Sequence, residues 1–134
     1  MGAPTMIDLA AFIGKYLGVA GTGNTPINKG QCVGLIEIWL SANIKPAIWA
    51  NAVDLLDMAD KKYYKKVVNI PTNEPPPGAI VCWDGTWGNG YGHTAIVVAA
   101  NVHQLVVFEQ NDPTGSPPIV ATHNYSHVTG WLKW

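Results

Sequence analysis

One cysteine lies where a polar, glycine-containing loop meets an apolar run: Cys32, in the stretch NKGQCVGLIEIWL. The apolar residues that follow have helical spacing, so Cys32 is expected at the first turn of a helix. That position offers free backbone N–H groups and the positive end of the helix dipole. Cysteine pKa values in such places fall from about 8.5 to about 4–7, and the thiolate is the nucleophilic form. Cys32 is therefore a candidate nucleophile, with a buried structural thiol as the alternative.

A nucleophilic thiol needs a base within hydrogen-bonding reach. The chain has four histidines. His93 differs from the others because it opens the apolar run HTAIVVAA, where a strand provides a rigid mount beside a loop. His103 lies in a predicted turn, and His123 and His127 lie near a C-terminal loop. We therefore favour His93 as the base, with an ordinary strand-end histidine as the alternative.

A third group must hold the base in its reactive orientation. The run QLVVFEQ predicts the next strand, and NVHQ predicts a tight turn between it and the strand of His93. The resulting antiparallel hairpin would bring Glu109 opposite His93, where a carboxylate can accept the imidazole N–H. Strand alternation places Asn111 on the same face as Glu109. The alternative is a polar strand end that only meets solvent.

The elements that would carry these residues change character along the chain. A first helix is predicted to begin at Thr5–Asp8 and to end at Gly18, with Ile13, Tyr16 and Leu17 facing the core. Further helices are predicted over 32–42 and 51–59, the latter with Val53, Leu56 and Leu55 inward. Six strands are predicted over residues 63–70, 79–83, 93–100, 104–110, 118–123 and 128–134. Helices followed by an antiparallel meander predict one α+β domain over 1–134, with helices packed on a curved sheet of five to six strands.

Composition excludes several classes of function. The net charge is −1, and all eight basic residues are lysines, so the arginine that usually reads phosphates and guanines is missing. We expect no nucleic-acid partner. No segment is apolar enough to span a membrane, and the N-terminal stretch lacks the basic lead-in of a secretory signal. We therefore expect no membrane insertion, and we also expect a monomer. The two cysteines are expected to be free thiols.

Taken in order, the segments GQCVGL, PPPGAIVCW, GHTAIVV and FEQN resemble the CHAP family, the cysteine, histidine-dependent amidohydrolases/peptidases. The segments WANAVDL and GWLKW are also similar to parts of that family, so the resemblance runs from about residue 16 to 134. It implies a papain-like α+β fold that hydrolyses bacterial peptidoglycan. The bond is left open between an N-acetylmuramoyl-L-alanine amidase and a stem or cross-bridge endopeptidase.

The resemblance also implies roles for single residues. Cys32 is the nucleophile, His93 is the general base and later the acid, and Glu109 orients the imidazole. Asn111 is a further polar support, and Gln31 lies near the oxyanion together with the Cys32 backbone N–H. The expected cycle passes through an acyl-enzyme at Cys32 that water hydrolyses.

Metal ligands are scarce in the sequence. Many CHAP enzymes hold calcium in an acidic loop before the cysteine, but no Asp or Glu occurs here between Asp8 and Glu37. Gly34 also stands where the family often has an acidic residue. The spacing of the cysteines and histidines shows no zinc-binding pattern. Cys82 is expected to be a core thiol whose side chain points to the opposite face of its strand from those of Val81 and Trp83. We therefore predict no metal, no cofactor and activity that survives chelation.

Aromatic residues flank the glycine-rich loop that leads to His93. Trp83, Trp87 and Tyr91 are expected to form a groove wall for a glycan or a stem peptide. The alternative is packing under a long loop.

Two other functions stay open at this stage. An NlpC-type cysteine endopeptidase also places a cysteine before a Gly-His pair, but its third residue is usually a histidine, for which His103 is the candidate. A non-catalytic wall- or glycan-binding domain of the same fold would explain the aromatic loop. Under the favoured interpretation the protein acts at the bacterial cell wall, which it would reach after lysis or through a phage-made pore.

Overall fold

The structure, a computed structural model, describes residues 8–134, so the predicted helix start at Thr5 lies outside it. Helix α1 covers Leu9–Tyr16, and the Asp8 side chain caps it by accepting the Ala11 N–H at 2.8 Å. Phe12 is its fully buried residue. The prediction for Leu17 was wrong: it follows the last helical turn and is 53% exposed.

Helix α2 covers Cys32–Ala42, as the sequence predicted. Its buried apolar residues are Leu35, Ile36, Trp39 and Leu40. The third predicted helix is a 3₁₀ turn, Ala52–Asp54, followed by the short helix α3, Leu55–Met58. Leu55 and Leu56 face inward as predicted, but Val53 is 38% exposed, because the 3₁₀ turn changes the helical phase.

All six predicted strands are present and antiparallel. They are β1 Lys65–Val68, β2 Ile80–Trp83, β3 His93–Ala100, β4 Leu105–Glu109, β5 Ile119–His123 and β6 Val128–Lys133. The sheet order is β1-β6-β2-β3-β4-β5, so the meander ends at β5 and β6 returns to lie between β1 and β2. Gly130 permits this insertion, since a Cβ there would lie 2.3 Å from the Val67 carbonyl oxygen.

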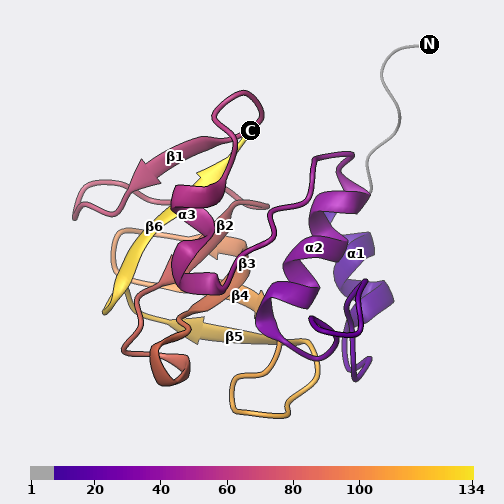
Figure 1. Cartoon of the computed structure of the whole chain (residues 1–134). Helices are drawn as coiled ribbons and strands as arrows, with labels where there is room; N and C mark the ends of the chain where they lie inside the picture. The colour runs from indigo at the N-terminus through magenta and orange to yellow at the C-terminus, as the bar shows by residue number, and fades with distance from the viewer. Residues whose placement is uncertain (1–7) are drawn as a thin grey trace.

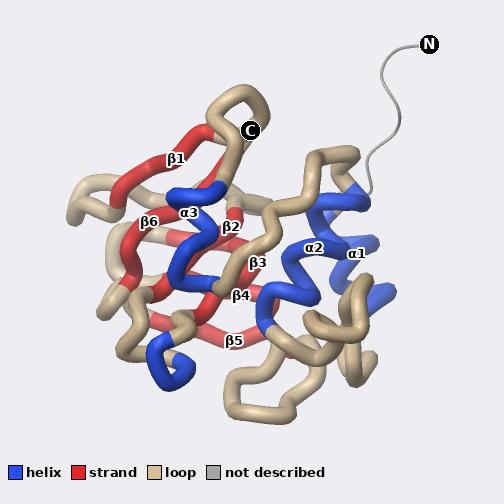
Figure 2. Tube along the Cα trace, in the orientation of Figure 1, coloured by secondary structure: helices blue, strands red, loops and turns tan. Residues whose placement is uncertain are grey.

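The central strands β2, β3 and β4 of the curved sheet are mostly buried on both faces. Helices α1 and α2 lie side by side next to the sheet and α3 lies across it (Figure 1), and the helices gather on one face of the strands (Figure 2). Ile80, Cys82 and Ile96 pack in the same cluster as the helices. Val81 and Trp83 belong to the second cluster, on the opposite face of the sheet. The predicted direction of Cys82 is confirmed, and both cysteines are free thiols.

No helix among residues 8–134 combines the length and the apolar content needed to cross a bilayer.

Candidate active site

Cys32 is the first residue of α2, and a tightly packed loop delivers the chain to it. Gly34 faces this loop: a Cβ there would lie 2.1 Å from the Asn28 carbonyl oxygen and 2.7 Å from the Thr22 carbonyl oxygen. No side chain fits at that distance, so the acidic residue that the family often carries at this position has no room here. Burial of the loop against the helix therefore fixes where the thiol lies.

Gln110 ties the same loop to the end of β4, and sequence reasoning missed it. Its side chain is fully buried. Its Oε1 accepts the Thr22 N–H at 3.1 Å, and its Nε2 donates to the carbonyl oxygens of Thr22 and Gln31 at 2.8 and 2.7 Å. The only sequence signal for Gln110 is its position, because it follows directly after the last residue of an apolar strand. Gln110 thereby joins the peptide before Cys32 to the strand that carries Glu109.

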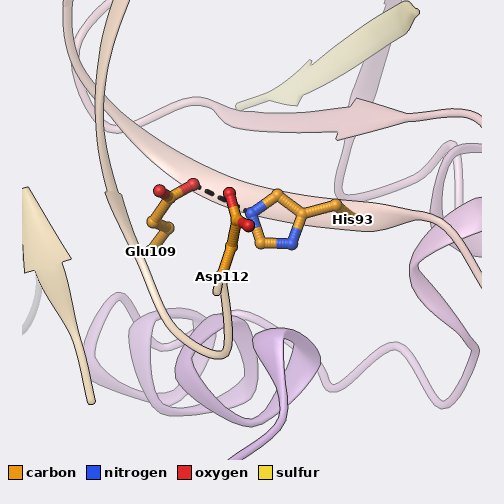
Figure 3. A group of neighbouring side chains, drawn as sticks. All are labelled: His93, Glu109 and Asp112. Atoms are coloured by element: carbon orange, nitrogen blue, oxygen red, sulfur yellow. Dashed lines mark hydrogen bonds and ion pairs between the residues drawn. The ribbon is translucent and has the colours of Figure 1, made fainter. Parts of the chain in front are cut away.

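His93 opens β3, where it pairs with Trp83 of β2. Its Nε2 lies 2.9 Å from Oε1 of Glu109, and both side chains are almost fully buried. Because a carboxylate only accepts hydrogen bonds, Nε2 carries a proton. The other ring nitrogen points away from Glu109 (Figure 3) and is left for a second partner.

Cys32 is the candidate second partner. Both residues line the same cleft, and the Cys32 thiol lies close enough to the His93 ring to affect its pKa. Burial by itself lowers the pKa of His93, but hydrogen bonding to Cys32 and Glu109 outweighs it and raises the pKa to about 9. His93 is therefore protonated at neutral pH, held between a sulfur atom and a carboxylate.

Glu109 accepts hydrogen bonds from two histidines. Besides His93, His123 of β5 places its Nε2 2.9 and 3.0 Å from the two carboxylate oxygens. Burial raises the pKa of Glu109, but the bonds from His123 and then His93 hold it below its ordinary value. Sequence reasoning missed His123, because it pairs with Leu105 in the sheet and reaches Glu109, four residues further along β4, only through its side chain.

The two polar residues next to this group contact each other rather than His93. Asn111 lies beyond β4 with φ 68°, so strand alternation does not extend to it and the prediction of a shared face with Glu109 was wrong. Its Nδ2 donates to Oε1 of Gln31 at 3.2 Å, and its Oδ1 accepts the Gly115 N–H at 2.7 Å. Gln31 lines the cleft beside Cys32, with its amide oriented by Asn111.

The cleft has a volume of about 860 Å³ and contains most of the predicted substrate-contacting residues. Trp87 and Tyr91 line it, and Trp87 also stacks on His93 at 5.4 Å between ring centroids. Trp83 has no exposed surface and packs against His93 from the core, so the groove-wall prediction was wrong for it. The exposed Trp49, which the prediction did not include, lies on the cleft instead.

Two places in the described chain bring possible metal ligands together. Ligand atoms of His93, Glu109 and Asp112 lie within 4.8 Å of one another (Figure 3), but Glu109 already serves two histidines. In the loop before Cys32, Oδ1 of Asn28 accepts the N–H groups of Asn24 and Thr25, each at 3.0 Å. An amide oxygen so engaged, in a loop without carboxylates, does not fit calcium.

His103 lies in the turn between β3 and β4, at the opposite end of β3 from His93. The strand length separates the two residues by about 23 Å at its usual rise per residue. His103 therefore cannot orient His93, and the third residue that an NlpC-type enzyme requires is not supplied by it.

The chain is similar to one protein family and to several solved structures. The model of the CHAP domain family matches residues 21–111. Among solved structures, the endolysin LysIME-EF1 is similar at a TM-score of 0.72 and 21% identity, covering 96% of this chain and 64% of its own. Ly7917, solved "with the hydrolyzing product of MDP", is similar at a TM-score of 0.66 and 19% identity, and the match covers 94% of this chain and 62% of Ly7917. PlyC is similar at a TM-score of 0.63 and 23% identity, and the match covers 93% of this chain and 35% of the PlyC chain.

The chain thus spans less than two thirds of the length of these proteins, and the identities establish a shared fold. No curated protein matched the sequence. The family match covers residues from the loop before Cys32 to Asn111 and includes every residue of the Cys32–His93–Glu109 group. The chain belongs to the CHAP domain family.

Proposed function

We propose that this protein is a peptidoglycan hydrolase that cleaves an amide bond with Cys32 as its nucleophile. The observation that carries the proposal is the hydrogen-bonded pair of His93 and Glu109, with His93 on the wall of the cleft that Cys32 also lines. Membership in the CHAP family and similarity to solved endolysins support a cell-wall substrate.

In the first half of the cycle the thiolate attacks the carbonyl carbon of the amide, and a carbon–sulfur bond forms. Protonated His93 then donates its proton to the leaving nitrogen as the carbon–nitrogen bond breaks, which releases the amine and leaves an acyl-enzyme. In the second half neutral His93 accepts a proton from water, and the hydroxide attacks the acyl carbon. Cys32 leaves as the thiolate, and the carboxylic acid product dissociates.

The neighbouring groups orient and stabilise these steps. Glu109 holds the tautomer in which Nε2 of His93 is protonated and stabilises the imidazolium. The Cys32 backbone N–H at the helix start and the Gln31 side-chain amide are the proposed oxyanion donors. Asn111 donates a hydrogen bond to the side-chain oxygen of Gln31 and so orients the Gln31 amide. The N–H groups of that amide are then left for the substrate.

Replacement of the nucleophile tests this function. Cys32→Ala is expected to abolish lysis of purified bacterial walls while circular dichroism shows a folded protein. Cys82→Ala, at a buried thiol outside the cleft, is the matched control and should keep its activity. Lysis by Cys32→Ala at the wild-type rate would contradict the proposal. Mass spectrometry of the released fragments would then distinguish cleavage after the glycan, by an amidase, from cleavage within the peptides.

A second candidate function is a non-catalytic glycan- or wall-binding domain. The exposed aromatic rings of Trp49 and Tyr91 on the cleft favour it, because such faces suit sugars. The two functions differ in the reactivity of Cys32 toward a thiol probe at neutral pH. Fast labelling favours the enzyme, and slow labelling favours the binding domain.

We further propose that the protein acts as a monomer at the bacterial cell wall. The route consistent with an endolysin-like fold is release from the cytoplasm by lysis or passage through a phage-made pore. Peptidoglycan is the only partner the mechanism requires, and no step uses a cofactor or membrane insertion.

A further inference from the structure

One part of the cleft, here called the Glu37 lobe, is lined by Val33, Glu37, Ile48, Trp49 and Ala50. Val33 and Glu37 are four residues apart on α2, so they lie on the same side of the helix. Val33 follows Cys32 directly. The lobe therefore begins beside the candidate nucleophile and continues along the helix.

The lobe combines apolar walls with a single carboxylate. Val33, Ile48 and Ala50 contribute aliphatic surface, and Trp49, which is 64% exposed, stands at the rim. Glu37 is the only acidic side chain among these five residues and is 2% exposed. A pocket with aliphatic walls and one buried anion is complementary to an aliphatic chain that ends in a cation.

The Glu37 carboxylate has no compensating charge in the part of the chain that the structure describes. Its two oxygens share one donor, the Ile48 N–H, at 3.1 and 3.3 Å. No Lys or His among residues 8–134 lies within ion-pair distance of it. Burial raises the pKa of Glu37 to about 7, against the lowering effect of the Ile48 bond. One neutral donor is poor compensation for a buried carboxylate, which normally pairs with a cation.

We propose that the Glu37 lobe binds an alkylammonium group of the substrate, the amine-bearing side chain of a basic amino acid next to the scissile amide. This inference rests on the proposed function and makes Glu37 a specificity-determining residue. Glu37 is five residues from Cys32, about 7.5 Å along the helix axis. An ammonium on a flexible four-carbon stem can bridge such a separation, and the ring of Trp49 can add a cation–π contact.

Chemical modification of the wall tests this in an activity assay. Acetylation of the free amines of the stem peptides removes their charge, and reductive methylation keeps it. We expect wild-type kcat/KM to fall about 10- to 100-fold on acetylated walls, the usual effect of losing one hydrogen-bonded charge, and to fall much less on methylated walls. Glu37→Gln keeps an acceptor for the Ile48 N–H but loses the charge. It should show the same loss on untreated walls and no further loss on acetylated ones.

Equal cleavage of untreated and acetylated walls by the wild type would overturn the inference while leaving the Cys32 mechanism intact. Discrimination that persists unchanged in Glu37→Gln would overturn it as well, because another group would then read the amine. In either case the role of Glu37 would be limited to accepting the Ile48 N–H and so fixing the backbone there.

A binding experiment judges the lobe without relying on activity. Nα-acetyl-lysine N-methylamide is titrated into the wild-type protein, and the backbone amide resonance of Ile48 reports on its carboxylate partner. We expect a saturable shift that is absent with the Nε-acetylated analogue and absent in Glu37→Gln. If the Ile48 resonance does not respond to the charged probe, the inference fails. If no wall is cleaved but the shift occurs, the proposed reaction fails and the ammonium site stands.

Discussion

His123 provides a sharp test of the contacts beneath the candidate base. Its Nε2 lies 2.9 and 3.0 Å from the two oxygens of Glu109, the same carboxylate that holds His93. Within the described chain the lining of the cleft does not include His123. It is therefore a positioning residue that acts through Glu109, and its loss should lower kcat and leave KM nearly unchanged.

The size of the effect follows from the type of contact. A hydrogen bond to a charged group contributes about 1.5–3 kcal/mol. Because the His123 side chain is 18% exposed, water replaces part of it, and we expect the lower part of that range. A loss of about 1.5–2 kcal/mol in transition-state stabilisation corresponds to about a 10- to 30-fold lower kcat in His123→Leu.

The pH profile separates this role from a purely structural one. Among the contacts that lower the pKa of Glu109, the bond from His123 is the largest. Its removal raises the pKa of Glu109, so the carboxylate becomes protonated at a higher pH and the acid limb of the activity profile moves upward. His123→Gln retains an N–H donor and should lie closer to the wild type.

His103→Leu is the matched control, because His103 is an exposed histidine in the turn between β3 and β4. The assay is turbidity loss of purified walls from pH 4 to pH 10, with thermal melts for each variant. Wild-type kcat and an unmoved acid limb in folded His123→Leu would refute the reasoning. A larger loss in His103→Leu than in Glu109→Gln would instead favour the NlpC-type arrangement.

Three further predictions concern the same framework. First, the pKa of His93 is raised to about 9 and the leaving nitrogen needs the His93 proton, so kcat/KM should fall above about pH 9. In Glu109→Gln this alkaline limb of the pH–rate profile should move to lower pH, because the carboxylate that helps to raise the pKa of His93 is lost. Second, the pKa of Glu37 is raised from 4.5 to about 7, so the folded state loses stability as pH rises between these values. Between pH 5 and pH 8, the free energy of unfolding of Glu37→Gln, measured in urea, should rise by up to about 3 kcal/mol relative to that of the wild type. A difference between the two proteins that does not change with pH would count against a buried, uncompensated carboxylate. Third, chelation with EDTA should leave wall lysis unchanged, since the Asn28 amide already holds the loop before Cys32; loss of lysis that calcium restores would contradict this.

The local parts of this site could be predicted from the sequence because they depend on local rules. Helical spacing after Cys32 placed α2 correctly, and the apolar run that follows His93 predicted a strand with that residue at its start. A short turn between two such runs fixed an antiparallel pair and brought Glu109 near His93. Each of these inferences spans few residues.

The parts that were missed depend on contacts between segments far apart in the chain. His123 reaches Glu109 from the neighbouring strand, where it pairs with Leu105, and Gln110 meets a loop 79 to 88 residues before it. The buried position of Trp83 depends on β6 returning beside β2, which alternation along one strand does not reveal. Glu37 gave no signal, because a single acidic residue in an apolar helix does not disclose what surrounds it.

The most direct test of the account measures the reactivity of the two thiols side by side. Wild-type protein and His93→Ala are treated with iodoacetamide at neutral pH, and the modification of Cys32 and Cys82 is followed by mass spectrometry. We expect rapid alkylation of Cys32, none at the buried Cys82, and a markedly slower reaction of Cys32 in His93→Ala. A Cys32 that reacts no faster in the wild type than in His93→Ala would contradict the central claim that the imidazole activates this sulfur.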